Sequence, residues 1–126
     1  MLTSAASKAR RTKARFQVLL TTTMATVALS GAAIAQGSVG QAIITGIAID
    51  THDDNMAFIS VNVAKTDNPA CSTSAWAFVL PLTTPLQNLM FSQLLAARTA
   101  QRFVSLSGSG LCDTYASVET LTFVNF

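Results

Sequence analysis

The sequence predicts a mainly β domain of five short strands, with one helix between the third and the fourth strand. Two observations lead to this prediction. After residue 40, five segments are rich in β-branched and other apolar residues and are separated by turn-forming residues. One further segment repeats its apolar residues at steps of three and four, which is the spacing of a helix. We expect these elements to form a single domain over residues 36–126, with no internal repeat.

Residues 1–35 have the organisation of a secretory signal peptide. Five basic residues precede an apolar run, FQVLLTTTMATVALSGAAIA, that ends in small residues before Gln36. Ala33 and Ala35 supply the A-x-A pattern of a cleavage site, so we expect cleavage before Gln36. The alternative is a retained membrane anchor, although the threonines in the run suit a spanning helix poorly. We expect a secreted or periplasmic protein that meets the membrane only during export.

Removal of the signal segment reverses the net charge of the chain. The whole sequence has eight Lys and Arg against six Asp and Glu. Residues 36–126 keep three of these basic side chains and all six acidic ones, which gives a net charge of −3. Because binding to phosphates requires cations that replace their counterions, we expect no nucleic-acid partner.

Two cysteines, Cys71 and Cys112, remain in the mature chain. In an exported protein two cysteines most simply form one disulfide. A domain of this size buries only roughly 60–65% of the surface that its unfolded chain exposes, so its core is thin. Closing a loop of about 40 residues contributes on the order of 4 kcal/mol to stability in the chain-entropy model. We therefore expect a structural disulfide.

The first two predicted strands form a hairpin. QAIITGIAID (41–50) alternates isoleucines with other residues, and Gly46 indicates a bend or bulge within it. MAFISVNVAK (56–65) also alternates, and the polar turn THDDN joins the two strands. The preceding QGSVG (36–40) is expected to be a flexible lead-in.

The third strand, WAFVL (76–80), follows the loop TDNPACSTSA and ends at Pro81. Trp76 has two interpretations: it packs in the core around the disulfide, or it forms an exposed platform for a ligand. RFVSLSG (102–108) and SVETLTFVNF (117–126) are predicted as the last two strands.

The helix is predicted over TPLQNLMFSQLLAARTAQ, residues 84–101. Thr84 is a favourable N-cap, Pro85 suits the first helical position, and Gln87 completes a capping box. The spacing of the apolar residues predicts one buried stripe, formed by Leu86, Leu89, Met90, Leu94 and Ala97.

A second apolar face of the helix carries Phe91 and Leu95, with Arg98 beside them. Either the sheet covers a wide part of the helix, or these three residues form a contact between subunits of a homo-oligomer. The sequence leaves both alternatives open.

The predicted element order is that of the OB-fold, a partly open barrel of five strands. The alternative is an α+β sheet with the helix packed on one face. Between Asn68 and Glu119 the chain carries the pattern NPAC…W.F.L…LLAA…V.L.G.G.C…E. In this it resembles small secreted bacterial domains with one disulfide, among them the OB-fold B subunits of pentameric toxins of the subtilase-cytotoxin type. The resemblance covers the layout of nearly all the mature chain.

That resemblance implies a ring of five subunits that binds cell-surface glycans. No residue of this chain matches a sugar-binding motif, so no contact residue is carried over. OB-folds bind ligands on the face of strands two and three and on the loops that join strands one to two and four to five. Here those loops are DTHDDN and SGSGLCDTY, and the candidate ligand residues are Asp50, His52, Asp53, Asp113 and Tyr115.

Carboxylates on these loops would accept hydrogen bonds from sugar hydroxyls, while a sugar ring would pack on Tyr115. The alternative is that THDDN is a solvated hairpin tip, because Asp and Asn favour turns in their own right. We expect no metal, since the turn lacks the glycine and final glutamate of an EF-hand loop and one histidine makes a poor zinc site.

We also expect no cofactor and no enzymatic activity, because the sequence shows no nucleophile elbow and has a single histidine. The sequence therefore predicts an exported binding module for a carbohydrate or another small ligand. The alternative is a structural or envelope-associated protein that acts through protein–protein contacts.

Overall fold

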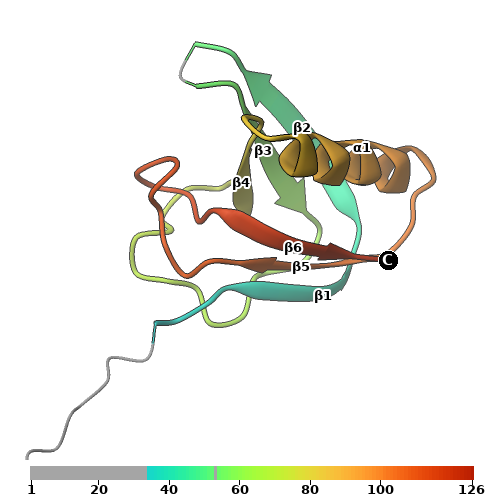
Figure 1. Ribbon diagram of the computed structural model, residues 1–126. Helices are drawn as coiled ribbons and strands as arrows, with labels where there is room; N and C mark the ends of the chain where they lie inside the picture. The colour runs from blue at the N-terminus through green and yellow to red at the C-terminus, as the bar shows by residue number, and fades with distance from the viewer. Residues whose placement is uncertain (1–33, 53) are drawn as a thin grey trace, which may run out of the picture. The chain divides into compact units, whose positions relative to one another are not determined.

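The computed structural model describes residues 34–52 and 54–126. Its elements are β1 (Ser38–Ala42), β2 (Ile44–Asp50), β3 (Met56–Val61), β4 (Phe78–Pro81), α1 (Pro85–Thr99), β5 (Val104–Gly108) and β6 (Leu121–Asn125). The strands form two three-stranded antiparallel sheets, in the orders β1-β5-β6 and β2-β3-β4. Figure 1 shows these sheets and the helix that follows β4. The mainly β fold with a single helix between strands is confirmed for the residues that the structure describes.

The expected first strand, 41–50, is divided into β1 and β2, and the two parts belong to different sheets. Gln41 has a φ of 55°, and the pairing of β1 with β5 shifts register between Val39 and Ala42. The pairing of β2 with β3 shifts between Ile44 and Gly46, where the sequence indicated a bulge. Such irregularities bend a strand, so the chain leaves one sheet and enters the other. The described residues therefore form two sheets and no closed barrel.

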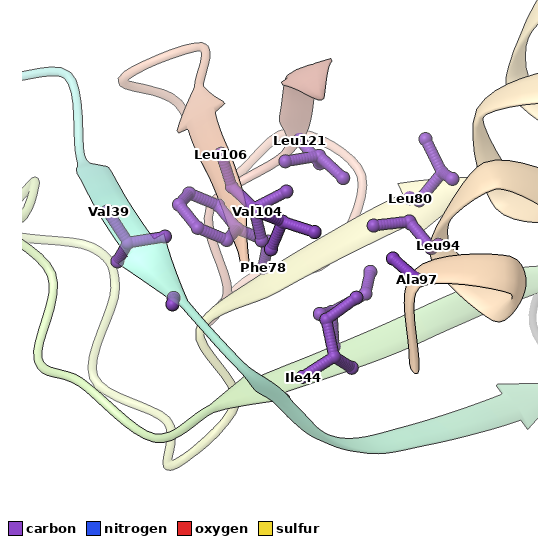
Figure 2. Packing of buried hydrophobic residues seen from close by; sticks show 11 residues of the cluster. Val39, Ile44, Phe78, Leu80, Leu94, Ala97, Val104, Leu106 and Leu121 are labelled. Carbon is purple, nitrogen blue, oxygen red and sulfur yellow. The ribbon is translucent and has the colours of Figure 1, made fainter. Parts of the chain in front are cut away.

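One hydrophobic core joins both sheets to the helix. Its buried members come from every element and are Val39, Ala42, Ile44, Ile59, Phe78, Leu80, Leu94, Ala97, Val104, Leu106 and Leu121. Figure 2 shows side chains of β1, β4, β5, β6 and α1 meeting in this cluster. Because each sheet turns one face toward the same cluster, the core does not require the strands to close into a barrel.

A second, smaller cluster lies on the opposite face of the β2-β3-β4 sheet. Met56, Phe58, Val79 and Val118 are its buried members, and Ala48 and Trp76 pack against it. The residues of β3 therefore alternate between two apolar clusters, and Met56 to Ile59 are all buried. This explains why β3 is apolar on both faces, whereas the sequence pattern indicated one buried face.

The helix has the predicted cap but a different buried face. Thr84 and Gln87 form the capping box, and Pro85 begins the helix. Leu94 and Ala97 are buried, whereas Leu86 is 67% exposed and Leu89 is 56% exposed. The predicted buried stripe is therefore wrong at its N-terminal end.

Besides Leu94 and Ala97, the helix turns Met90 and Phe91 toward the core, and both are partly buried against it. Leu95 is 42% exposed. The sheet covers Phe91 but not its neighbour one turn further along the helix. The physical reason is that α1 makes its contacts with β2 and β4, so only the residues that face those strands are covered.

The expected flexible lead-in, 36–40, is instead part of the fold. Gly37 is buried, Ser38 begins β1, and Gln36 donates a side-chain hydrogen bond to the carbonyl of Gly108. Of the predicted signal segment 1–35, residues 1–33, which include Ala33, lie outside the described residues. No helix within the part of the chain that is described is long and apolar enough to cross a membrane.

The predicted disulfide between Cys71 and Cys112 is present, with a Cα–Cα distance of 6.1 Å that lies in the usual range for such bridges. It joins the β3–β4 segment (62–77) to the β5–β6 loop (109–120). A disulfide is consistent with an oxidising compartment outside the cytoplasm.

Candidate functional site

The β3–β4 segment has little regular structure but is held at several points. Thr66 exchanges two backbone hydrogen bonds with Ser38, at the start of β1, at 3.1 and 2.9 Å. The amides of Thr73 and Ser74 both donate to the carbonyl of Ser117 at 3.1 Å. Together with the disulfide, these bonds fix an irregular segment against β1 and the β5–β6 loop.

A buried ion pair links this segment to the β5–β6 loop. Lys65 Nζ is 3.0 Å from Glu119 Oε2, and the two side chains are 7% and 0% exposed. The second carboxylate oxygen of Glu119 accepts hydrogen bonds from the amides of Gly37, at 2.9 Å, and Gly110, at 2.8 Å. A buried charge is tolerated only when it is paired and hydrogen-bonded, and Glu119 meets both conditions.

Glycines make room for the Glu119 side chain. A Cβ atom added at Gly108 would lie 2.3 Å from the carboxyl carbon of Glu119, and one added at Gly37 would lie 2.2 Å from Oε2. Gly110 has a φ of 79°, a conformation that favours glycine. The GSG sequence at 108–110 thus serves to enclose a carboxylate, in addition to admitting the bend next to Cys112.

Lys65 connects the ion pair to an open cavity. Its ammonium group also donates to Ser72 Oγ at 2.9 Å and lies 4.7 Å from the centre of the Phe78 ring. The cavity has a volume of about 240 Å³, and its polar lining consists of Lys65, Asn68, Ser72, Ser74 and Trp76. Lys65 is the single charged residue in that lining. Because Glu119 neutralises it, the cavity is polar but nearly neutral.

An aromatic cluster adjoins the cavity through Trp76. The ring centroids of Trp76 and Phe58 are 5.8 Å apart, and Tyr115 meets Phe58 edge to face at 5.0 Å. Trp76 is half-buried, so it both packs on the smaller core cluster and lines the cavity. Trp76 therefore lies between the smaller core cluster and the cavity.

One contact within the β2–β3 turn involves two of the predicted ligand residues. Asp50 Oδ1 accepts from the backbone amide of His52 at 2.8 Å, which is a local turn contact. Asp53 lies outside the described residues. Asp54 and Asn55 have positive φ values of 61° and 49°, which Asp and Asn tolerate better than most residues. Backbone geometry therefore accounts for the residue types at 54 and 55 of the turn.

Asp113 and Tyr115 lie on the β5–β6 loop, near the disulfide. Thr120 Oγ1 donates to Asp113 Oδ1 at 2.6 Å, and this bond is the main cause that lowers the pKa of Asp113 below that of an ordinary aspartate. Slight burial acts in the opposite direction, and the amides of Asp113 and Thr114 support the lowering. Tyr115 is 39% exposed and contacts the aromatic cluster. Of the five predicted ligand residues, Tyr115 is the one that this cluster connects to the cavity.

Among the residues that the structure describes, no group of three metal-ligating side chains lies close enough to hold an ion. Of the predicted oligomer contact, Leu95 is exposed, Arg98 is half-buried, and Phe91 packs against the core.

Comparison with known protein families, with curated proteins and with solved structures gives no significant match. The site must therefore be interpreted from its own chemistry.

Sequence reasoning did not select Lys65, Ser72 or Glu119 as site residues. One signal was present: Glu119 lies within the otherwise uncharged strand-like segment SVETLTFVNF, where a carboxylate requires a buried partner. The partner itself was not predictable, because Lys65 lies 54 residues earlier in the chain.

Proposed function

We propose that this chain is an exported binding module that holds a small, largely neutral polar ligand, such as a sugar ring, in the cavity beside Trp76. The observation that carries the proposal is the cavity itself. Binding sites for small molecules are typically concave, with an aromatic or apolar wall and a few fixed polar groups. Here Trp76 is the aromatic wall, and Lys65, Asn68 and Ser72 supply hydrogen-bonding groups.

The anchoring of the β3–β4 segment supports this function. A segment tied by a disulfide, by backbone pairing with β1 and by the Lys65–Glu119 ion pair loses little conformational entropy when a ligand binds. The cavity lining, which belongs to this segment, is thus in place before the ligand arrives.

We further propose that the two sheets are the halves of an opened OB-like barrel. Two features support this arrangement. β1 and β2 are separated only by Ile43, and Val79 of β4 forms a parallel bridge with Thr120, next to β6. In OB-folds the ligand binds on the face of the second and third strands. The corresponding strands here are β3, which carries Phe58, and β4. The segment that lines the cavity connects these two strands. Glycan binding, which the resemblance to toxin B subunits implies, fits the same surface.

The test uses the exported, purified protein on an array of glycans, followed by fluorescence titration with any glycan that binds. Trp76 is the single tryptophan of the chain, so its emission reports occupancy of the cavity directly. We expect at least one class of glycan to bind and to shift this emission.

Two variants distinguish binding in the cavity from binding elsewhere on the β3–β4 segment. Ala75→Arg places a long side chain in the cavity lining and is expected to abolish binding. Ala70→Arg adds the same charge at an exposed position of the same segment outside that lining, and it should bind as the wild type does. Binding that survives Ala75→Arg, or the absence of binding to every glycan, would overturn the proposal.

A second candidate function is a contact with other protein chains, including a homo-oligomer. Exposed apolar side chains favour it: Leu86, Leu89 and Leu95 on α1, and Phe103, Phe123 and Phe126 near β5 and β6. Single exposed apolar residues are normal, whereas three on one helix favour a contact with another chain.

Leu95→Arg tests this second function, because Leu95 is exposed and the substitution leaves the core intact. If the helix forms a subunit contact, sedimentation should show an oligomer for the wild type and a folded monomer for the variant. A wild-type protein that is monomeric at micromolar concentration would exclude the contact.

A further inference from the structure

The hydroxyl group of Ser72 identifies the chemical group that the cavity is suited to bind. Ser72 is 7% exposed and lines the cavity. Lys65 Nζ lies 2.9 Å from Ser72 Oγ, and an ammonium group can only donate, so Ser72 Oγ must accept this bond. The hydroxyl proton of Ser72 is therefore directed elsewhere.

No described residue accepts that proton. The backbone of Ser72 is engaged, since its amide donates to the carbonyl of Pro69 and its carbonyl accepts from Asn68 Nδ2, but its side chain has Lys65 as its one hydrogen-bond partner. Buried hydroxyl protons normally have an acceptor, and an unmet donor is costly. In the free protein water reaches this hydroxyl through the open cavity, so a ligand that displaces that water must itself supply the acceptor.

The donor is also a strong one. Glu119, Lys65 and Ser72 form a chain in which a carboxylate, an ammonium and a hydroxyl follow one another at 3.0 and 2.9 Å. An ammonium that donates to the hydroxyl oxygen draws electron density from it and makes its proton a better donor, because hydrogen bonds in a chain polarise one another.

The charge of the cavity favours a neutral acceptor over a carboxylate. Lys65 is the single charged group of the lining, and Glu119 already balances it. A ligand carboxylate would lose water without gaining an uncompensated cation, so the buried charge would oppose binding. A carbonyl oxygen accepts the same hydrogen bond without that penalty.

The apolar part of the lining favours a small methyl group next to the carbonyl. Ala64, Ala75 and Ala77 complete the cavity wall, and Trp76 provides a flat surface beside them. An acetamido group has the required parts, since its carbonyl oxygen is a strong acceptor and its methyl group suits alanine side chains. The ring that carries it would pack on Trp76.

We infer that the cavity selects an N-acetylated sugar, and that Ser72, held by Lys65, is the specificity-determining residue that donates to the acetamido carbonyl. This inference rests on the proposed binding function and specifies its ligand class.

The experiment compares N-acetylglucosamine, glucose and glucuronate in titrations of the exported protein followed by Trp76 fluorescence. We expect N-acetylglucosamine to bind about tenfold more tightly than glucose, which lacks the acetamido group, and glucuronate to bind no more tightly than glucose. The comparison among ligands requires no variant, so it tests the preference for an acetamido group even if a substitution at Ser72 disturbs folding.

Ser72→Ala and Ser74→Ala form a matched pair, because both serines line the cavity and only Ser72 is bonded to Lys65. Ser72→Ala should weaken binding of N-acetylglucosamine about five- to tenfold and leave glucose unchanged, and Ser72→Thr should retain the preference. Ser74→Ala should leave the ratio of the two affinities unchanged. Thermal unfolding of each variant verifies that it is folded.

The outcomes separate this inference from the function on which it rests. Equal binding of glucose and N-acetylglucosamine, tighter binding of glucuronate, or a preference that survives Ser72→Ala would overturn the acetamido inference and leave a sugar-binding module. If none of the three sugars alters the Trp76 emission and the glycan array is also blank, the proposed function itself fails.

Discussion

At the scale of single residues, one carboxylate organises much of the molecule. Glu119 is completely buried and accepts hydrogen bonds from Lys65, Gly37 and Gly110. These donors come from the β3–β4 segment, the residue before β1 and the β5–β6 loop. A buried ion pair adds little net stability compared with apolar residues, but removal of one partner is costly because the other charge remains buried. Loss of either partner is therefore expected to weaken the contact among these three segments.

Gly108→Ala tests the space around this carboxylate. The added Cβ would lie 2.3 Å from the Glu119 side chain, which cannot move away without breaking its hydrogen bonds. We expect the free energy of unfolding, measured by urea denaturation, to fall by about 1–3 kcal/mol. Gly40→Ala is the control, because nothing lies within 4 Å of its added Cβ, and it should change stability by no more than about 0.5 kcal/mol. Equal effects of the two substitutions would contradict the packing around Glu119.

Asp113 gives a prediction about pH. Because Thr120 Oγ1 donates to its carboxylate, the pKa of Asp113 in the folded protein lies below that of the unfolded chain. Its stabilising contribution is therefore present above the unfolded pKa and is lost as the pH falls through the folded pKa. NMR titration of the carboxyl group should show the lowered midpoint, and Thr120→Val should return it toward the ordinary value. A midpoint that Thr120→Val leaves unchanged would remove the hydrogen bond as the cause.

At the scale of elements, the helix shows how local and tertiary effects differ. Its start is fixed locally, because Thr84 accepts from the amide of Gln87 and the Gln87 side chain accepts from the amide of Thr84. Its orientation about its own axis depends on the strands beneath it. Contacts with β2 and β4 bury Leu94 and Ala97 and leave Leu86 in solvent, although all three are apolar and share the predicted stripe.

Leu94→Ala and Leu86→Ala test this orientation. Leu94 is completely buried in the core, so its truncation should lower the free energy of unfolding by about 2–5 kcal/mol. Leu86 is 67% exposed, and alanine is a good helix former, so the same truncation there should change stability by no more than about 0.5 kcal/mol. Chemical denaturation measures both. Similar losses for the two variants would show that the N-terminal part of the helix is covered.

At the scale of the whole molecule, the disulfide, the ion pair and the shared core connect two small sheets. Each sheet has three strands, too few to bury two faces independently, and the main core draws side chains from both sheets. The disulfide adds a covalent link between the β3–β4 segment and the β5–β6 loop, which border the smaller cluster and the cavity. The cavity lining lies within residues 64–77, in the segment that the disulfide and the ion pair hold in place.

Replacement of both cysteines, Cys71→Ser with Cys112→Ser, measures that connection. With a sequence separation of 41 residues between the cysteines, we expect the free energy of unfolding to fall by about 2–5 kcal/mol. Wild-type protein unfolded in the presence of a reductant is the matched comparison. If mass spectrometry finds both thiols free in protein that folds with the same stability, the bridge has no structural role.

The sequence by itself determined the local features of this protein. The helix cap at Thr84, the β-branched strands and the bulge near Gly46 follow from backbone preferences of neighbouring residues, and two cysteines allow only one intramolecular bridge. The order of strands around the helix was predictable for the same reason. Only the outer limits of the strands differed, and the break at Gln41 gave one additional strand.

The tertiary structure alone decided where the candidate site lies. The β2–β3 turn and the β5–β6 loop were predicted as the ligand surface, and the side-chain contacts of Asp50 and Asp113 are local to each. The cavity depends instead on Lys65, Ser72 and Glu119, which meet because both chain halves fold around one buried carboxylate. Side chains 54 residues apart have no local preference for each other. A buried Glu119 charge requires a paired cation, and the tertiary fold, rather than any local pattern, supplies Lys65 as that cation.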